Sequence, residues 1–162
     1  MAKEDYPQAL ASRVGFLLAR AHLIAREKAD SALAGVGISM KAYAALATLT
    51  SDGAISQQTL SRRIGMDPAT MVDVIDRLEQ SGHLIRRRNP QDRREYALQT
   101  TAKGRALFAR AERAIKGAEK ETLSALKPDE AQALLRLLGR LAEPRADASL
   151  ATDDMVSRAL GR

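Results

Sequence analysis

The sequence predicts a mainly α-helical chain with one small β-hairpin, and three observations lead to this fold class. Apolar residues recur three and four positions apart along most of the 162 residues, which is the spacing of one helical face. Residues that cap or stop helices stand at the ends of these stretches. A single pair of short strand-like runs, residues 84–88 and 95–99, interrupts the helical pattern.

A long first helix is expected from Pro7 to about Leu33. Its apolar stripe is wider than one small domain can cover, so this helix is expected to pack on helices of another chain. The glycines of residues 35–37 end it. The next helix is expected over residues 40–50, because Ser39 is a suitable N-cap.

Two short helices are expected next, with a tight turn between them. Ser56 is placed to cap the first, and Gly65 offers the positive φ that ends many helices. Asp67 caps the second, and Pro68 occupies its first position, where a missing N–H does no harm. One face of this second helix is apolar and therefore buried, through Met71, Val74, Ile75 and Leu78. Its opposite face is free to meet a partner.

The hairpin that follows is strongly basic. Between Leu84 and Tyr96 five arginines stand against two acids, which is half of the chain's net charge of +6. A one- or two-residue strand at residues 54–55 is expected to join the hairpin sheet. Two helices followed by a basic hairpin form a winged helix-turn-helix, in which the second helix can enter a major groove while the wing reaches a minor groove or the backbone.

These residues resemble a known family. Residues 69–82 look like the recognition helix of MarR-type transcriptional regulators. Residues 92–94, Asp-Arg-Arg, followed by Thr-Ala-Lys-Gly at 101–104, resemble that family's Asp-x-Arg wing and the helix start after it. The resemblance extends from about residue 10 to residue 141. It implies a homodimeric regulator built around a winged helix-turn-helix core.

The sequence departs from the family pattern in two places. Val72 and Asp73 stand where the recognition helix usually has a polar residue and then arginine. An aspartate cannot clamp guanine, although it can accept from the amino group of cytosine. Thr100 replaces the usual leucine before Thr101, which can still cap the next helix.

The predicted DNA-binding residues follow from these positions. Phosphate contacts are expected where the first short helix begins, from Ser56, Gln57 and Gln58. Base edges are expected to meet the exposed start of the second, at Pro68, Ala69, Thr70 and Asp73. Arg77 is expected either to meet a phosphate or to pair with an acid such as Asp92. Minor-groove or backbone contacts are expected from Arg93 and Arg94 at the tip of the wing. Arg86 and Arg88 flank the wing and are expected to add phosphate contacts.

Two further helices are expected after the wing, over residues 101–126 and 128–141, and the tail 145–162 is either a frayed end or an arm that grips a partner. The outer helices carry more apolar surface than the winged core can cover, so a closed dimer is the expected solution. We therefore predict three parts, which are an N-terminal helix in the dimerisation region (1–36), a DNA-binding domain (37–101) and C-terminal dimerisation helices (102–162).

The resemblance also implies an effector site, because many MarR-type regulators release DNA when a small, often phenolic, anion binds between the dimer helices and the winged core. In this chain that site would be lined by Phe16, His22, Arg26, Met40, Tyr43 and Met66. His22 lies one turn before Arg26, so the pair could meet an anion. The alternative is that this pair forms an ordinary polar face and that Met40 and Tyr43 belong to the core.

Composition excludes several other classes. There is no cysteine, which rules out a disulfide scaffold and thiol-based sensing, and His22 and His83 have no local carboxylate spacing for a metal. No cofactor is expected. The chain shows no Gly-rich phosphate loop and no recognisable triad, so an enzyme is not expected. It has no signal-like core and no apolar run near the ~18 residues of a membrane span, so a cytoplasmic protein without membrane contacts is expected.

The predicted function is therefore that of a homodimeric, sequence-specific regulator of transcription, most simply a repressor. It would bind a pseudo-palindromic double-stranded operator and be released by a small effector. The alternative is a winged-helix module for protein–protein or RNA contacts, which Val72 and Asp73 on the recognition helix keep open.

Overall fold

The computed structural model describes residues 7–88 and 96–143. This part of the chain is mainly helical and contains one small sheet, which confirms the predicted fold class. The elements in chain order are α1 (Gln8–Ala11), α2 (Val14–Ala34), α3 (Met40–Asp52), β1 (Ile55–Ser56), α4 (Gln57–Ile64), α5 (Pro68–Gln80), β2 (Leu84–Arg88), β3 (Tyr96–Thr100), α6 (Ala102–Thr122) and α7 (Pro128–Ala142).

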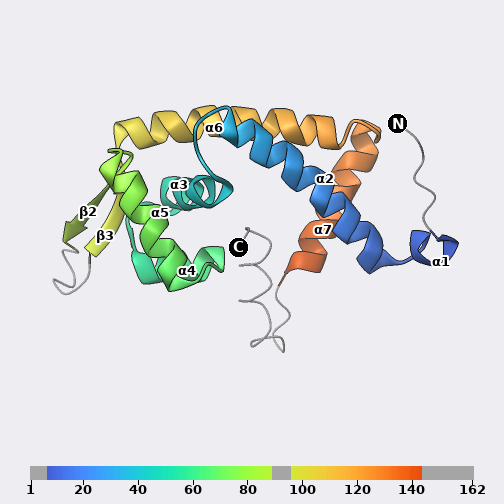
Figure 1. Cartoon of the computed structure of the whole chain (residues 1–162), viewed down its shortest axis with the longest axis horizontal. Helices are drawn as coiled ribbons and strands as arrows, with labels where there is room; N and C mark the ends of the chain where they lie inside the picture. The colour runs from blue at the N-terminus through green and yellow to red at the C-terminus, as the bar shows by residue number, and fades with distance from the viewer. Residues whose placement is uncertain (1–6, 89–95, 144–162) are drawn as a thin grey trace.

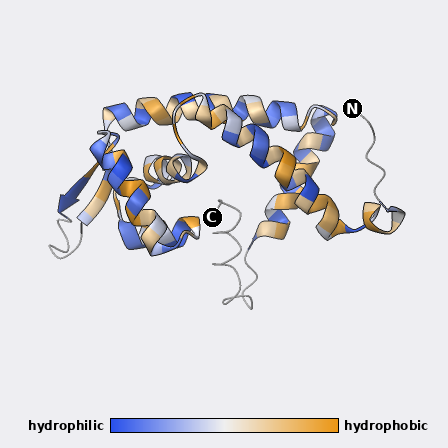
Figure 2. Ribbon diagram, in the orientation of Figure 1, coloured by the Kyte–Doolittle hydropathy of each residue, from blue (hydrophilic) through white to orange (hydrophobic). Residues whose placement is uncertain are grey.

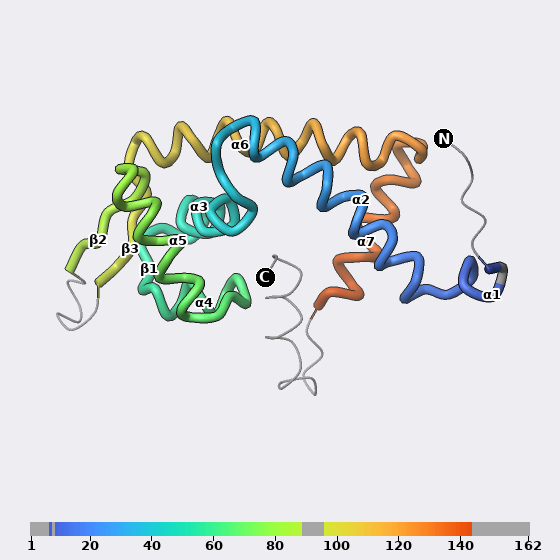
Figure 3. Tube along the Cα trace, viewed as in Figure 1, coloured from blue at the N-terminus to red at the C-terminus, as the bar shows by residue number. Residues whose placement is uncertain are grey.

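The long helix α6 runs along most of the length of the molecule (Figure 1). The winged core, which comprises α3, α4, α5 and the three strands, lies under one end of α6. Helices α2 and α7 lie toward its other end, and α2 packs along α6 (Figure 3). Lys28 on α2 and Glu121 on α6 form an ion pair of 3.6 Å across this contact. The winged core is therefore tied to the outer helices through one continuous element.

The winged core has its own hydrophobic interior. Each of its helices contributes side chains that are almost fully removed from solvent, including Leu46, Leu49, Leu60, Met71 and Ile75. Leu84 and Leu98 close this interior from the sheet side. A smaller cluster of Leu33, Ala111 and Ile115 joins α2 to α6. The apolar face predicted for the recognition helix is thus confirmed as core.

The predicted helix caps are present in the structure. The side chains of Ser39, Ser56, Asp67 and Thr101 each accept a hydrogen bond from the backbone N–H three residues later, at 2.9–3.2 Å. Gly65 has φ +67° and lets α4 end at Ile64, three residues before the cap of α5. Local side-chain chemistry therefore sets the turn between the two short helices.

The sheet has the strand order β1-β3-β2, and all its pairs are antiparallel. Ile55 pairs with Leu98, which confirms the short strand predicted before the first helix of the pair. Leu84 pairs with Thr100 and Arg88 with Tyr96, so the hairpin strands are fully in register. The loop at residues 89–94, with the predicted turn, lies outside the described residues.

Two predicted helix boundaries are wrong. The helix expected from Pro7 to about Leu33 is two helices, because Arg13 has an extended backbone (φ −92°, ψ 119°) that an α-helix cannot contain. Residues 9–12 before Arg13 are exposed in the chain itself, and helix propensity alone rarely holds four residues. Helix α6 ends at Thr122 instead of Leu126, because Leu123 leaves the helical conformation (φ −89°, ψ 5°). The tail 145–162 lies outside the described residues.

Apolar surface remains exposed at the end of the molecule away from the winged core. Helix α7 is amphipathic, yet none of its residues is buried. Figure 2 shows hydrophobic residues along α7 and the first half of α2. The exposed large apolar side chains of these two helices include Val14, Leu17, Leu18, Leu23, Leu135, Leu137 and Leu141. Within the described ranges, no helix has both the length and the apolar character needed to cross a membrane.

Candidate nucleic-acid interface

Helix α5 presents one face to solvent because its other face is fixed in the core. Met71, Ile75 and Leu78 are buried, and Asp67 holds the first turn through its hydrogen bond with the N–H of Thr70. This bond lowers the pKa of the Asp67 carboxyl, so the cap is charged at neutral pH. The predicted base-reading residues Pro68, Ala69 and Asp73 are exposed, and Thr70 is half-buried.

Helix α4 supports α5 and supplies the residues predicted to hold a phosphate. The hydroxyl of Ser61 donates to the carbonyl of Met66 and so ties α4 to the turn before α5. Gln58 is exposed and Gln57 is half-buried. Ser56 is occupied as a cap, since its Oγ accepts from the N–H of Thr59 at 3.2 Å and lies 3.1 Å from the Thr59 hydroxyl.

The basic strand β2 lies beside α5. Arg88 is exposed at the end of this strand, as expected of a residue that meets DNA. Arg77 on α5 is exposed too, and its predicted partner Asp92 lies outside the described residues. Arg93 and Arg94 also lie outside the described residues. Their roles at the DNA, like those of the other predicted contact residues, stay predictions.

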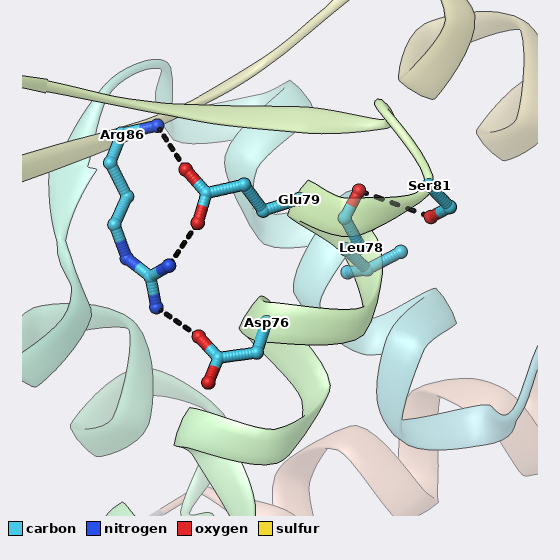
Figure 4. A network of polar contacts seen from close by, with 5 residues as sticks. All are labelled: Asp76, Leu78, Glu79, Ser81 and Arg86. Carbon is cyan, nitrogen blue, oxygen red and sulfur yellow. Dashed lines mark hydrogen bonds and ion pairs between the residues drawn. The ribbon is translucent and has the colours of Figure 1, made fainter.

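Arg86 on β2 is bound to α5 by its side chain (Figure 4). Its Nη2 lies 2.6 Å from Oδ1 of Asp76, and its Nη1 donates to Oε2 of Glu79. The hydrogen bond with Asp76 is the main reason that the pKa of Arg86 is raised, and partial burial acts in the opposite direction. Sequence reasoning missed both acids, although their i, i+3 spacing places them near one another on a helix next to a basic strand.

A second set of contacts fixes the turn after α5 to the start of α6. The Thr101 hydroxyl donates to the carbonyl of Gly82 at 2.8 Å, and Lys103 Nζ donates to the carbonyl of Ser81 at 2.8 Å. Ser81 Oγ lies 2.7 Å from Nδ1 of His83. Burial, assisted by Lys103 and Arg110, lowers the pKa of His83. The turn that ends α5 is thus held by the helix that reaches the outer part of the molecule.

The residues predicted to line an effector site come from two parts of the molecule, α2 and the winged core. Phe16, His22 and Arg26 lie on α2, where Arg26 Nε contacts Asp30 Oδ2 at 3.4 Å and His22 is exposed. Met66 is buried in the winged core. Met40 and Tyr43 lie one turn apart and pack against the Leu33, Ala111 and Ile115 cluster. Their role in effector binding stays a prediction.

Tyr43 joins the winged core to α6. Its ring stacks on Phe108 with centroids 5.8 Å apart, and its hydroxyl donates to Oε2 of Glu112 at 2.7 Å. Burial is the main cause of the strongly raised pKa of Tyr43, and the carboxylate of Glu112 raises it further. The same hydrogen bond lowers the pKa of Glu112, with a smaller contribution from Lys116 at 3.3 Å.

An open hollow of about 570 Å³ lies between α2 and α6. It is farther from the winged core than the contact between Tyr43 and Phe108 is. Its walls include Ile24, Lys28, Ala32, Ala114, Ala118 and Glu121. None of the six residues predicted to bind an effector lines it. Within the described ranges, no group of three or more His, Cys, Asp or Glu side chains is arranged to hold a metal ion.

Comparisons with known proteins agree with this arrangement. The family model for the MarR family matches residues 38–96, which cover most of the winged core. A protein assigned to transcriptional regulation of the hcr operon in Thauera aromatica is 30% identical over 133 residues, which make up 82% of this chain and 80% of that protein.

Two solved structures have the same fold over most of the chain. One is the transcriptional repressor CouR bound to a 23-mer DNA duplex, with a TM-score of 0.78 and 30% identity over 86% of this chain and 99% of that one. The other is BpsR of Bordetella bronchiseptica, whose DNA binding is regulated by 6-hydroxynicotinic acid. Its TM-score is 0.76 at 26% identity, over 86% of this chain and 100% of that one.

Proposed function

The chain belongs to the MarR family of transcriptional regulators, and from this premise we propose that it is a homodimeric repressor released from its operator by a small effector. The observation that carries this proposal is the position of α5. One face of that helix is buried, and the opposite face is exposed beside the arginine strand β2. A helix presented in this way can enter a major groove while the wing follows the backbone. Such a repressor acts by binding and not by catalysis, and it would work in the cytoplasm.

The individual roles that we propose follow from exposure and chemistry. Pro68, Ala69, Thr70 and Asp73 approach base edges, whereas Ser56, Gln57, Gln58, Arg77 and Arg88 meet phosphates. Arg93 and Arg94 reach the minor groove or the backbone, as the sequence motif predicts. Asp73 is expected to influence which base pair is preferred, because it can accept only from an amino group such as that of cytosine.

The partner that we propose for the exposed apolar helices is a second copy of the chain, which would cover them. Helix α7 and the first half of α2 expose large side chains that no element of the described chain covers. A two-fold dimer would bury them and would present two copies of α5 to half-sites about one helical turn of DNA apart. Under this proposal residues 1–36 and 102–162 serve dimerisation, and residues 37–101 bind DNA.

Effector release is supported by a relative and by the site's surroundings. DNA binding by BpsR is regulated by 6-hydroxynicotinic acid, a small aromatic anion. In this chain the aromatic pair Tyr43 and Phe108 lies where α3 meets α6, between the winged core and the outer helices. A ligand inserted there would change the angle between the winged core and the outer helices. The predicted site residues Phe16, His22, Arg26, Met40, Tyr43 and Met66 remain the candidates.

The direct test is fluorescence anisotropy on a duplex from the chain's own upstream region, against a scrambled duplex, over a salt series. We expect a preference of about a thousandfold for the specific duplex. Arg94→Ala should weaken binding by about 1–3 kcal/mol. Asp73→Ala should change which duplex is preferred more than it changes affinity. Equal weak binding to both duplexes would favour the alternative, a module for protein or RNA contacts, for which the acidic Asp73 is the supporting observation.

A further inference from the structure

Three groups connect β2 to α5, and they form what we call the clamp: Arg86, Asp76 and Glu79 (Figure 4). The guanidinium of Arg86 binds one carboxylate with each terminal nitrogen. The backbone N–H of Arg86 also points to Oε1 of Glu79, at 3.4 Å. A planar, always charged guanidinium suits such a two-carboxylate arrangement better than any other side chain. The wing strand and the recognition helix are therefore joined through main chain and side chain together.

The clamp also changes the charge of the recognition helix. Helix α5 contains three acids, Asp73, Asp76 and Glu79, against one base, Arg77. A helix with an excess of negative charge is repelled by the phosphates on both sides of a groove. Arg86 places a positive charge between two of these acids, whose side chains are 44% and 36% exposed. The acidity that remains near the bases is mainly that of Asp73.

We propose that Arg86 is a positioning residue that holds the wing strand at a fixed angle to α5 and offsets one of the two negative charges of Asp76 and Glu79, and that it does not itself contact a phosphate. Its side chain is only 28% exposed, and both terminal nitrogens already have carboxylate partners. Each terminal nitrogen keeps a second N–H, but a phosphate that approached it would lie beside two carboxylates and would be repelled by them. The inference rests on the proposed function, because it concerns the same interface with DNA.

The deciding variant is the double substitution Asp76→Asn with Glu79→Gln. It replaces each carboxylate by an amide of nearly the same shape and makes the chain two charges more positive. If charge alone governed binding, the variant would bind DNA more tightly. If the clamp positions the wing, the variant binds its operator more weakly, on the order of tenfold, as is typical of coupled charged neighbours. The two readings therefore predict opposite signs.

Arg86→Gln completes the test as a mutant cycle. On the wild-type background it weakens operator binding, whichever reading holds. On the Asp76→Asn, Glu79→Gln background it causes little further loss and leaves the salt slope unchanged, because the clamp is already broken. A phosphate contact would instead reduce that slope by about one unit.

Arg87→Gln is the matched control. Arg87 alternates with Arg86 along the strand and so faces the other side of the sheet. Its effect should therefore be the same on both backgrounds.

Readouts without DNA separate this inference from the proposed function. The NMR signals of the Arg86 guanidinium should show restricted rotation in the wild-type protein and free rotation in the double variant. Free rotation in the wild type, or equal or tighter operator binding by the double variant, overturns the clamp. A wild type with no operator preference but restricted rotation contradicts the proposed function alone. Circular dichroism checks folding, and Asp76→Asn alone replaces the double variant if that variant unfolds.

Discussion

At the scale of single residues, Gly104 is constrained by the close approach of a neighbouring backbone. It lies in the first turn of α6, where the N–H of Gly104 donates to the Thr101 hydroxyl at 3.0 Å. The helix passes the backbone of His83 so closely that a Cβ atom on Gly104 would lie 1.9 Å from the His83 carbonyl oxygen. Because that oxygen belongs to the main chain, it cannot move aside without displacing the start of β2.

Gly104→Ala should therefore destabilise the protein even though alanine is the better helix former. Forcing atoms into a filled space costs about 1–3 kcal/mol or more, against a gain of about 1 kcal/mol in helix propensity. Urea unfolding at one fixed protein concentration measures the net change. Gly117→Ala, in the same helix, is the control, since a Cβ atom on Gly117 meets nothing within 4 Å. Equal stability of Gly104→Ala and wild type would contradict the close approach.

The residue scale also shows what sequence reasoning can reach. The caps Ser39, Ser56, Asp67 and Thr101 were predictable because each bonds an N–H three residues away. The partners of Arg86 were not, because they lie seven and ten residues away on another element. An arginine in a basic run is equally compatible with a phosphate contact and with an ion pair. Only the packing of β2 on α5 distinguishes the two.

At the scale of elements, strand and helix identity followed from periodicity, whereas some helix ends did not. The break at Arg13 leaves no strong signal in the sequence, because the apolar spacing continues across it. Packing decides such ends, and the first half of α2 has few packing partners within the described chain. The junction of α3 with α6 is a better-defined contact. It depends on the hydrogen bond between Tyr43 and Glu112.

This junction should respond to pH at both ends of the scale. The pKa of Glu112 is lowered in the folded state, so its stabilising contribution is full above the ordinary value of 4.5 and is lost as the pH falls through the folded pKa. The pKa of Tyr43 is raised above its ordinary value of 10.0. The contribution of Tyr43 to stability is therefore full below pH 10 and is lost as the pH rises beyond 10.

The test is the melting temperature from pH 3 to pH 11. Tyr43→Phe should flatten both limbs of the profile relative to wild type, because it removes the hydroxyl that both shifts share. Glu112→Gln should flatten the acidic limb, since it removes the titrating carboxyl and leaves an amide oxygen that can still accept from Tyr43. Profiles of both variants that run parallel to wild type would show that the pair contributes little to the pH dependence of stability.

At the scale of the whole molecule, the winged core is complete in itself but the outer helices are not. The winged core encloses its own apolar cluster, whereas α7 buries none of its residues in the described chain. Leu135 and Leu141 are 59% and 68% exposed. Fully burying a leucine contributes about 1.5–3 kcal/mol, so an amphipathic helix of this kind is stable only against a partner. Both the dimer and the spacing of its two recognition helices then depend on α7.

Leu135→Glu should therefore separate the subunits and abolish operator binding together. A carboxylate placed in an apolar interface costs several kcal/mol, enough to raise the dissociation constant of the dimer by on the order of a hundredfold or more. Sedimentation velocity over a concentration series measures the first effect, and anisotropy on the operator duplex measures the second. Gln132→Glu introduces the same charge on the polar face of α7 and should leave both unchanged. If Leu135→Glu stayed dimeric while Gln132→Glu dissociated, the interface would lie on the Gln132 side of α7, one turn from Leu135. If both variants stayed dimeric and bound DNA, α7 would not form the interface, and another part of the chain, such as α2, would have to hold the two recognition helices at their spacing.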